Sequence, residues 1–284
     1  MSFGANACLH VDALWGGNSF PNIWQNIQWE DSIVGRLTYL LVHLSNEYPG
    51  EGWDLFLSPP NDEAASDSGA QQKRPNWERI WIIGYSQGSG HAGYLAQTHT
   101  LAGAGLLSGP QDEDYTCAQA QELQEELIIS PLFWIEMPFA TQNIRAMAHM
   151  QEASIEQIQE NWSRMPFKNS EDYFIIGNEH DAMKVRLPTN TPWLTTIPPQ
   201  PNATCAAFNR AFHCSTAANG NVPIVEVEGD TNPYLYASSV WPQLAGFTPS
   251  TATDKEKASD NTSSSVARDS VWTSVVVLSL VFVF

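Results

Sequence analysis

The chain has 284 residues, of which 43% are hydrophobic, enough for one domain with a sizeable core. Lys and Arg number 13 against 31 Asp and Glu, a net charge of −18, which argues against a nucleic acid or an anionic membrane surface as the partner. The four cysteines include no C-x-x-C pair, so the sequence predicts no metal site, and we expect no cofactor.

The N-terminal part of the chain predicts one well-defined helix. Residues 8–15 are compatible with a short strand. A helix is expected over residues 33–44, because Ser32 can cap it and apolar residues recur at helical spacing. Residues 58–75 are rich in polar residues without periodicity and read as a loop, which leads to a strand over residues 77–83.

That strand runs into a Gly84-Tyr-Ser86-Gln-Gly88 sequence, and a helix-compatible stretch, residues 89–97, follows. A strand, a G-x-S-x-G turn and a helix are the parts of a nucleophile elbow. Gly84 and Gly88 allow the strand and the helix to approach, and the turn exposes the hydroxyl of Ser86 at a helix N-terminus. The sequence therefore predicts Ser86 as a catalytic nucleophile.

Strands and helices alternate after the elbow. Residues 103–107 form a short buried strand, and residues 172–177 a further one. This βαβ alternation is typical of a parallel sheet flanked by helices. We expect an α/β domain over residues 1–247.

The stretch between those two strands interrupts the alternation. Residues 140–162 read as a helix, and residues 130–165 as a cap over the site. Residues 187–201 are rich in Pro and Thr and are expected to be irregular.

A serine nucleophile needs a histidine base and a carboxylate that orients the histidine. In α/β hydrolases these follow in the order Ser, Asp or Glu, His. Of the seven histidines, only His213 lies beyond the best acid loop, so it is the predicted base. Asp181, just past the strand at 172–177, is the first choice of acid; Glu179 and Asp112 remain alternatives.

The oxyanion hole needs two donors. One is expected to be the backbone N–H of Gln87, the residue after the nucleophile, at the positive end of the elbow helix. The other usually comes from a glycine-containing loop, and the upstream candidate is Gly16-Gly17.

Several features favour a secreted chain. Sequons for glycosylation begin at Asn161, Asn202 and Asn261. In an oxidising compartment, Cys205 and Cys214 would form a local disulfide beside His213; free buried thiols are the alternative.

The C-terminus predicts a membrane attachment. Residues 248–270 have the composition of a disordered spacer, and residues 271–284 are apolar. Because the apolar stretch is short for a spanning helix, it matches a GPI signal with attachment near Asn261; a tail anchor is the alternative. We therefore expect an extracellular, membrane-attached protein.

The chain resembles the α/β-hydrolase superfamily, and more closely a little-characterised, mostly secreted branch of it. The likeness is good over residues 30–115 and loose over residues 170–245. It is carried by Ser32-Ile33, Arg36-Leu37, Glu51-Gly52-Trp53, Asn76-Trp77-Glu78-Arg79-Ile80, Gly84-x-Ser86-Gln87-Gly88-x-Gly90-His91-Ala92-x-Tyr94, Ser108-Gly109-Pro110-Gln111-Asp112 and His213-Cys214-Ser215.

The resemblance implies a serine hydrolase acting on a small-molecule or lipid ester. It also implies strands, an oxyanion loop and a signal peptide ahead of residue 31 that this sequence lacks, so we expect the chain to be N-terminally incomplete. The alternative function is a catalytically inactive surface glycoprotein that keeps the hydrolase fold for binding.

Overall fold

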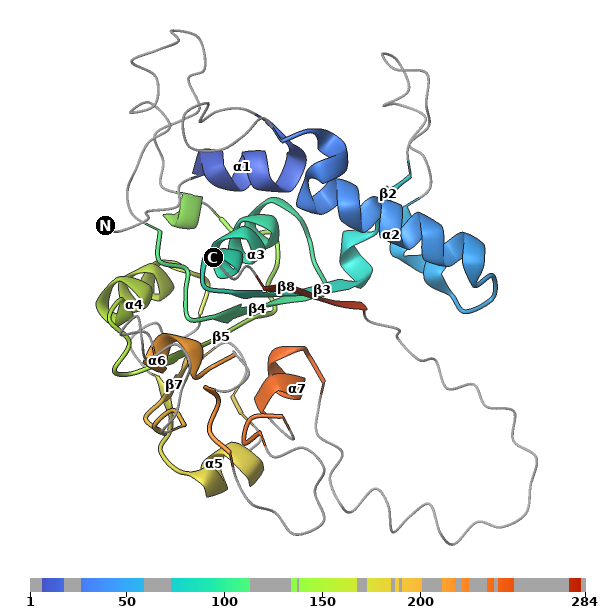
Figure 1. Ribbon diagram of the computed structural model, residues 1–284. Helices are drawn as coiled ribbons and strands as arrows, with labels where there is room; N and C mark the ends of the chain where they lie inside the picture. Colours follow the sequence, from blue (N-terminus) through green and yellow to red (C-terminus); the bar gives the residue numbers. More distant parts are fainter. Residues whose placement is uncertain are drawn as a thin grey trace, which may run out of the picture.

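Six parallel strands form the central sheet of the molecule, in the order β6–β7–β5–β4–β3–β8 (Figure 1). The strands are β3 (Ile80–Tyr85), β4 (Gly103–Leu107), β5 (Ile144–His149), β6 (Phe174–Ile176), β7 (Trp193–Thr195) and β8 (Val276–Val281). A short antiparallel pair, β1 (Leu57–Ser58) and β2 (Arg74–Pro75), lies outside this sheet. The computed structural model describes residues 7–17, 27–58, 73–112, 134–136, 138–167, 173–184, 187–188, 191–200, 211–217, 221–224, 234–237, 240–247 and 276–281.

Helices flank the sheet, which confirms the predicted α/β fold. They are α1 (Ala7–Trp15), α2 (Ile33–Glu47), α3 (Gln87–Thr98), α4 (Ile155–Arg164), α5 (Glu179–Lys184), α6 (Ala211–Cys214) and α7 (Val240–Leu244). Helix α2 matches the prediction: the Ser32 hydroxyl accepts a hydrogen bond from the Gly35 N–H and caps it.

Alternate residues of the strands face two separate cores. Ile80 and Ile82 of β3 point into a core shared with α1, α2 and α3. Ile83 and Tyr85 point to the opposite face, into a core that includes Val240 of α7. Figure 1 shows α1, α2 and α3 on one side of the sheet and α5 and α7 on the other. Burial on both faces explains the nearly continuous apolar sequence of β3.

Residues 8–15 form helix α1 and not the predicted strand. His10, Asp12 and Leu14 are buried in this helix. The segment instead packs against α2 and α3, and Leu14 belongs to their shared core.

Two strands in the interior of the sheet were missing from the prediction, in addition to the edge strand β8. The predicted helix at 140–162 and the cap at 130–165 contain β5, which lies between β4 and β7 in the sheet, followed by the separate helix α4. Residues 187–201 are not wholly irregular, because they contain β7. Both strands are completely buried, so neither shows the polar alternation of a half-exposed strand.

The sheet edge beside the nucleophile strand is formed from the C-terminal segment. Strand β8 runs parallel to β3, with Val276 opposite Ile80 and Val281 opposite Tyr85. The spacer at 248–270 lies outside the described residues. The anchor signal predicted over residues 271–284 stays a prediction.

Candidate active site

The elbow has the geometry that its sequence predicts. Strand β3 ends at Tyr85, Ser86 adopts φ 55° and ψ −122°, and α3 begins at Gln87. A positive φ is strained for a residue with a side chain, and such strain concentrates at functional sites. A Cβ atom on Gly84 would lie 1.9 Å from the Gly88 carbonyl oxygen, so the strand and helix can meet only because position 84 is glycine.

The structure brings Ser86 and His213 together, as the chain order suggested. The His213 Nε2 lies 2.8 Å from the Ser86 Oγ, within hydrogen-bonding distance. His213 stands in the short helix α6, with 13% of its side chain exposed. The centroid of the Tyr85 ring lies 5.1 Å from that of the His213 imidazole, and this packing restricts the movement of the imidazole.

The carboxylate against His213 is Glu152, which the sequence analysis did not consider. Its Oε1 lies 2.5 Å from the His213 Nδ1, and its side chain is 1% exposed. Glu152 follows β5 by three residues, and its N–H donates to the His149 carbonyl in the turn that leaves the strand. With the proton on Nδ1, His213 donates to Glu152 and can accept from Ser86.

The prediction of the acid is therefore wrong, because none of the three predicted carboxylates is the one that contacts His213. Asp181 bonds to Asn178, through the Asn178 amide and its own N–H, at the start of α5. Glu179 is exposed in the same turn. Asp112 is buried but pairs with His10.

The acid was missed because its strand was missed. Ile144-Arg-Ala-Met-Ala-His149 contains Arg, Met and two Ala, which favour helices, and it has one β-branched residue. Once this segment was assigned to a helix, the next recognisable strand supplied the acid. A strand assignment here would have placed Glu152 just past a strand end and between Ser86 and His213 in the chain.

The backbone around the base is fixed from β4. Ser108, which follows β4 with φ 49°, donates its hydroxyl to the His213 carbonyl at 3.1 Å and pairs with the Thr216 hydroxyl at 2.8 Å. Its N–H donates to the Met147 carbonyl of β5. The ends of β4 and β5 and the base-bearing helix are thus joined by short polar contacts.

His149 shapes the turn that holds the acid. Its Nε2 lies 3.0 Å from the Ile197 carbonyl oxygen, and its Nδ1 accepts from the Gln151 N–H at 3.0 Å. Burial lowers the pKa of His149, against opposing effects from the Ile197 hydrogen bond and the Glu152 charge. A neutral imidazole suits both contacts, since one nitrogen donates and the other accepts.

One of the two predicted oxyanion donors has a suitable position. The Gln87 N–H occupies the first position of α3, where helix N–H groups lack intrahelical partners. The predicted second donors, Gly16 and Gly17, are otherwise engaged: their N–H groups donate to the carbonyls of Asp12 and Ile27, each at 2.9 Å. That part of the prediction is wrong for this arrangement of the chain.

A second histidine–carboxylate pair lies inside the protein. His10 Nε2 is 2.6 Å from Asp112 Oδ2, and His10 Nδ1 is 2.9 Å from His91 Nδ1. The Trp134 indole N–H also donates to Asp112. Burial, and then the charge interaction with His10, hold the pKa of His91 well below its ordinary value.

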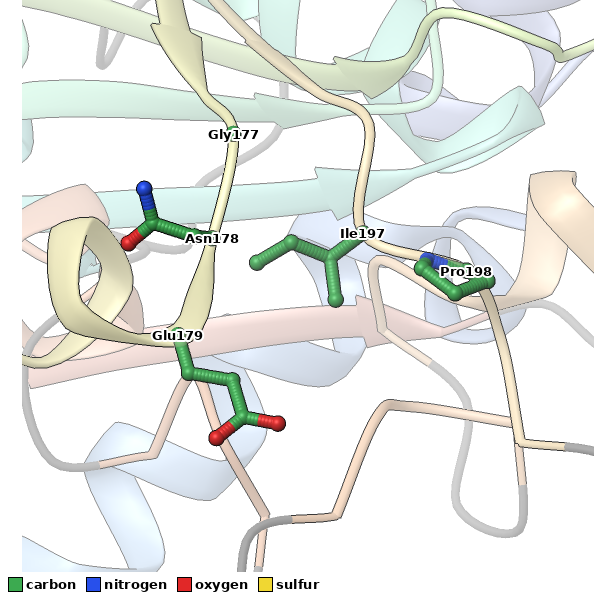
Figure 2. Close-up of a pocket in the computed structure, with 5 residues that line it drawn as sticks. All are labelled: Gly177, Asn178, Glu179, Ile197 and Pro198. Carbon is green, nitrogen blue, oxygen red and sulfur yellow. The ribbon is translucent and has the colours of Figure 1, made fainter.

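An open pocket of about 470 Å³ lies at the carboxyl ends of β6 and β7. Figure 2 shows Asn178 and Glu179 on one side of it and Ile197 and Pro198 on the other. None of its lining residues belongs to the Ser86–His213–Glu152 group.

The other predicted sites have mixed outcomes. Asn161 is fully buried and its amide donates to the carbonyls of Pro110 and Asp112, so it is not a glycosylation site in the folded protein. Cys214 is disulfide-bonded. Its predicted partner Cys205, Asn202 and Asn261 lie outside the described residues.

Within the described ranges, no cluster of His, Cys, Asp or Glu has the arrangement of a metal site. No helix in the same ranges has both the length and the apolar character needed to cross a membrane.

These observations define a protein with a parallel α/β sheet and a Ser-His-Glu constellation at the carboxyl ends of its strands. No protein-family model, curated protein or solved structure matches the chain.

Proposed function

We propose that the protein is a serine hydrolase of the esterase or lipase type, which acts on an ester through an acyl-enzyme at Ser86. The observation that supports this most strongly is the continuous relay from Ser86 Oγ through His213 to Glu152, with contacts of 2.8 and 2.5 Å. The relay joins three elements far apart in the sequence. The strained elbow conformation of Ser86 supports the same proposal.

In this mechanism the Ser86 Oγ attacks the ester carbonyl carbon while His213 Nε2 takes the hydroxyl proton. Glu152 stabilises the imidazolium and keeps the Nδ1 proton in place. The oxyanion accepts a hydrogen bond from the Gln87 N–H, aided by the dipole of α3. His213 then protonates the departing alcohol, and the same groups activate water to hydrolyse the acyl-enzyme.

A catalytically inactive binding protein with this fold is the second candidate, because Gly16 and Gly17 do not supply the other oxyanion donor. Losing one donor typically costs about 10²- to 10³-fold in kcat. Slow turnover is therefore compatible with the first candidate, whereas complete absence of a reactive serine favours the second.

We also propose that the protein works outside the cell, as a glycoprotein. Attachment to the membrane through its C-terminus would require residues 276–281 to leave the sheet, where β8 pairs with β3. The disulfide at Cys214 supports an oxidising compartment. The substrate is proposed only as a small-molecule or lipid ester, since fold and triad do not set specificity.

The test is a comparison of wild type with Ser86→Ala, using p-nitrophenyl esters and a fluorophosphonate probe. We expect wild type to turn over the ester and to be labelled, and Ser86→Ala to do neither. Ser163→Ala is the matched control, because its hydroxyl is exposed and, among the described residues, bonds to the Glu160 carbonyl of its own helix α4 and not to the triad. Labelling that persists in Ser86→Ala would contradict the proposal, and a folded wild type without labelling would favour the binding protein.

A further inference from the structure

Gln111 lies where the loop after β4 meets the turn after β5. Its Nε2 is 3.1 Å from the Ser108 carbonyl oxygen and 3.1 Å from the Glu152 Oε1. Its Oε1 accepts a hydrogen bond from the Ser154 hydroxyl at 3.2 Å. The two amide protons and the amide oxygen therefore all have partners, two of which belong to the turn that holds the acid.

The same amide nitrogen is 3.4 Å from the His213 Nδ1. When the His213 Nδ1 carries the proton that it donates in the hydrogen bond to Glu152, it has no lone pair left to accept a hydrogen bond from Gln111. The approach is then a packing contact, and it brings Gln111 against both members of the acid–base pair.

The Glu152 carboxylate has few partners. Within the described part of the chain, its Oε1 accepts from Gln111 and His213, and its buried Oε2 has no hydrogen-bond partner. A buried carboxylate held through one oxygen can rotate unless that oxygen is fixed, and each lost donor is costly. Gln111 is thus the one described group besides the base that holds this carboxylate.

We propose that Gln111 is a positioning residue of the relay: its amide fixes Glu152 Oε1 in line with the His213 Nδ1 proton. The kinetic consequence rests on the proposed function, whereas the position of the carboxylate does not. The residue type follows from the contacts. A donor must face both Ser108 and Glu152 while an acceptor faces Ser154, and an uncharged amide of this length meets all three demands.

Two substitutions test the proposal. Gln111→Met keeps the approximate volume and removes the donors, and we expect kcat to fall about 10- to 100-fold with KM little changed, the loss expected for one hydrogen bond to a charged group. Gln111→Glu places a second carboxyl beside Glu152. While protonated, that new carboxyl can donate to Glu152; once ionised, it repels Glu152.

The ratio of Gln111→Glu to wild-type turnover should therefore fall from about pH 5 to about pH 8, across the range where a carboxyl next to another carboxylate ionises. A purely structural defect would lower the ratio equally at all pH values. The titratable groups at this position are Glu152, His213 and the adjacent His149, and all three are present in both proteins. Gln157→Glu is the matched control, because Gln157 bonds to the Asp112 carbonyl and Asn161 and to neither triad member.

A measurement that does not depend on turnover tests the positioning role of Gln111 separately from the proposed hydrolase activity. In an NMR spectrum the Nδ1 proton of His213 should resonate at low field, because it lies in a 2.5 Å contact with Glu152. We expect the resonance to persist in Gln157→Glu and to shift or disappear in Gln111→Met. An unchanged resonance in Gln111→Met overturns the positioning role, whether or not the protein hydrolyses esters. If the resonance shifts in Gln111→Met while the wild-type protein does not hydrolyse esters, the positioning role is supported and the enzymatic function is contradicted.

Discussion

The described part of the chain contains two histidine–carboxylate pairs of almost equal length but different surroundings. His213 lies 2.5 Å from Glu152, and His10 lies 2.6 Å from Asp112. The outer nitrogen of His213 meets the Ser86 hydroxyl, and 13% of the side chain is exposed. The outer nitrogen of His10 meets another imidazole, that of His91, and its side chain is fully buried.

The difference shows that a histidine–carboxylate pair does not by itself have the surroundings that a catalytic base requires. A base needs a nucleophile on its free nitrogen, and among the described residues only the His213 pair has one; His213 is also partly exposed, whereas His10 is not. The His10 pair instead joins α1, α3 and the loop after β4, and the Trp134 indole N–H also bonds to Asp112. We infer that one pair serves chemistry and the other stability.

The largest expected effect, on kcat, distinguishes Glu152 from Asp181 as the acid. Glu152→Gln keeps the shape of the side chain but removes the charge that stabilises protonated His213, so kcat for ester hydrolysis should fall about 10³- to 10⁴-fold. Steady-state kinetics with a p-nitrophenyl ester measures the loss. Asp181→Asn is the control, because Asp181 contacts Asn178 and not His213, and its activity should equal wild type. If Asp181→Asn lost activity and Glu152→Gln did not, the assignment of the acid would be reversed.

The next effect concerns the buried pair. His10→Ala leaves the Asp112 charge in the interior without its histidine, so the free energy of unfolding should fall by about 3–5 kcal/mol. Urea denaturation measures this change. Turnover per folded molecule, counted by fluorophosphonate labelling of Ser86, should stay near wild type. Loss of turnover at unchanged stability would erase the distinction between the two pairs.

The elbow and the base could be predicted because both follow from local sequence or chain order. Gly84 and Gly88 are required by close backbone approach, and His213 was the one histidine in the right place. Strand β4 was predicted with its observed bounds, because its apolar run is short and bounded by turn residues.

The acid could not be predicted because it depends on a strand whose residues favour a helix. Position in the middle of the sheet, between β4 and β7, overrides the helical preference of residues 144–149. The same limit applies to Asn161, whose sequon says nothing of its burial beneath the loop at Pro110. Tertiary contacts determine the strand at residues 144–149 and the burial of Asn161, and the spacing of residues along the chain carries no information about such contacts.

The smallest expected effect tests the buried cluster through pH. Burial lowers the pKa of His91 in the folded state, so below about pH 6.5 the unfolded chain binds a proton that the native protein does not. The contribution of His91 to the free energy of unfolding is therefore fully present above that pH. It falls as the pH drops, by up to about 1.4 kcal/mol per pH unit. Urea midpoints at about pH 7 and pH 5.5 measure the slope.

His91→Gln should flatten that slope by the contribution of one proton. Burial also lowers the pKa values of His99 and His149, and because both remain in the variant, the difference in slope belongs to His91. A variant with the wild-type slope would mean that His91 gains its proton equally in the folded and unfolded states. The buried cluster would then be open to protons, and the contrast between the two pairs would rest on the Ser86 hydroxyl alone.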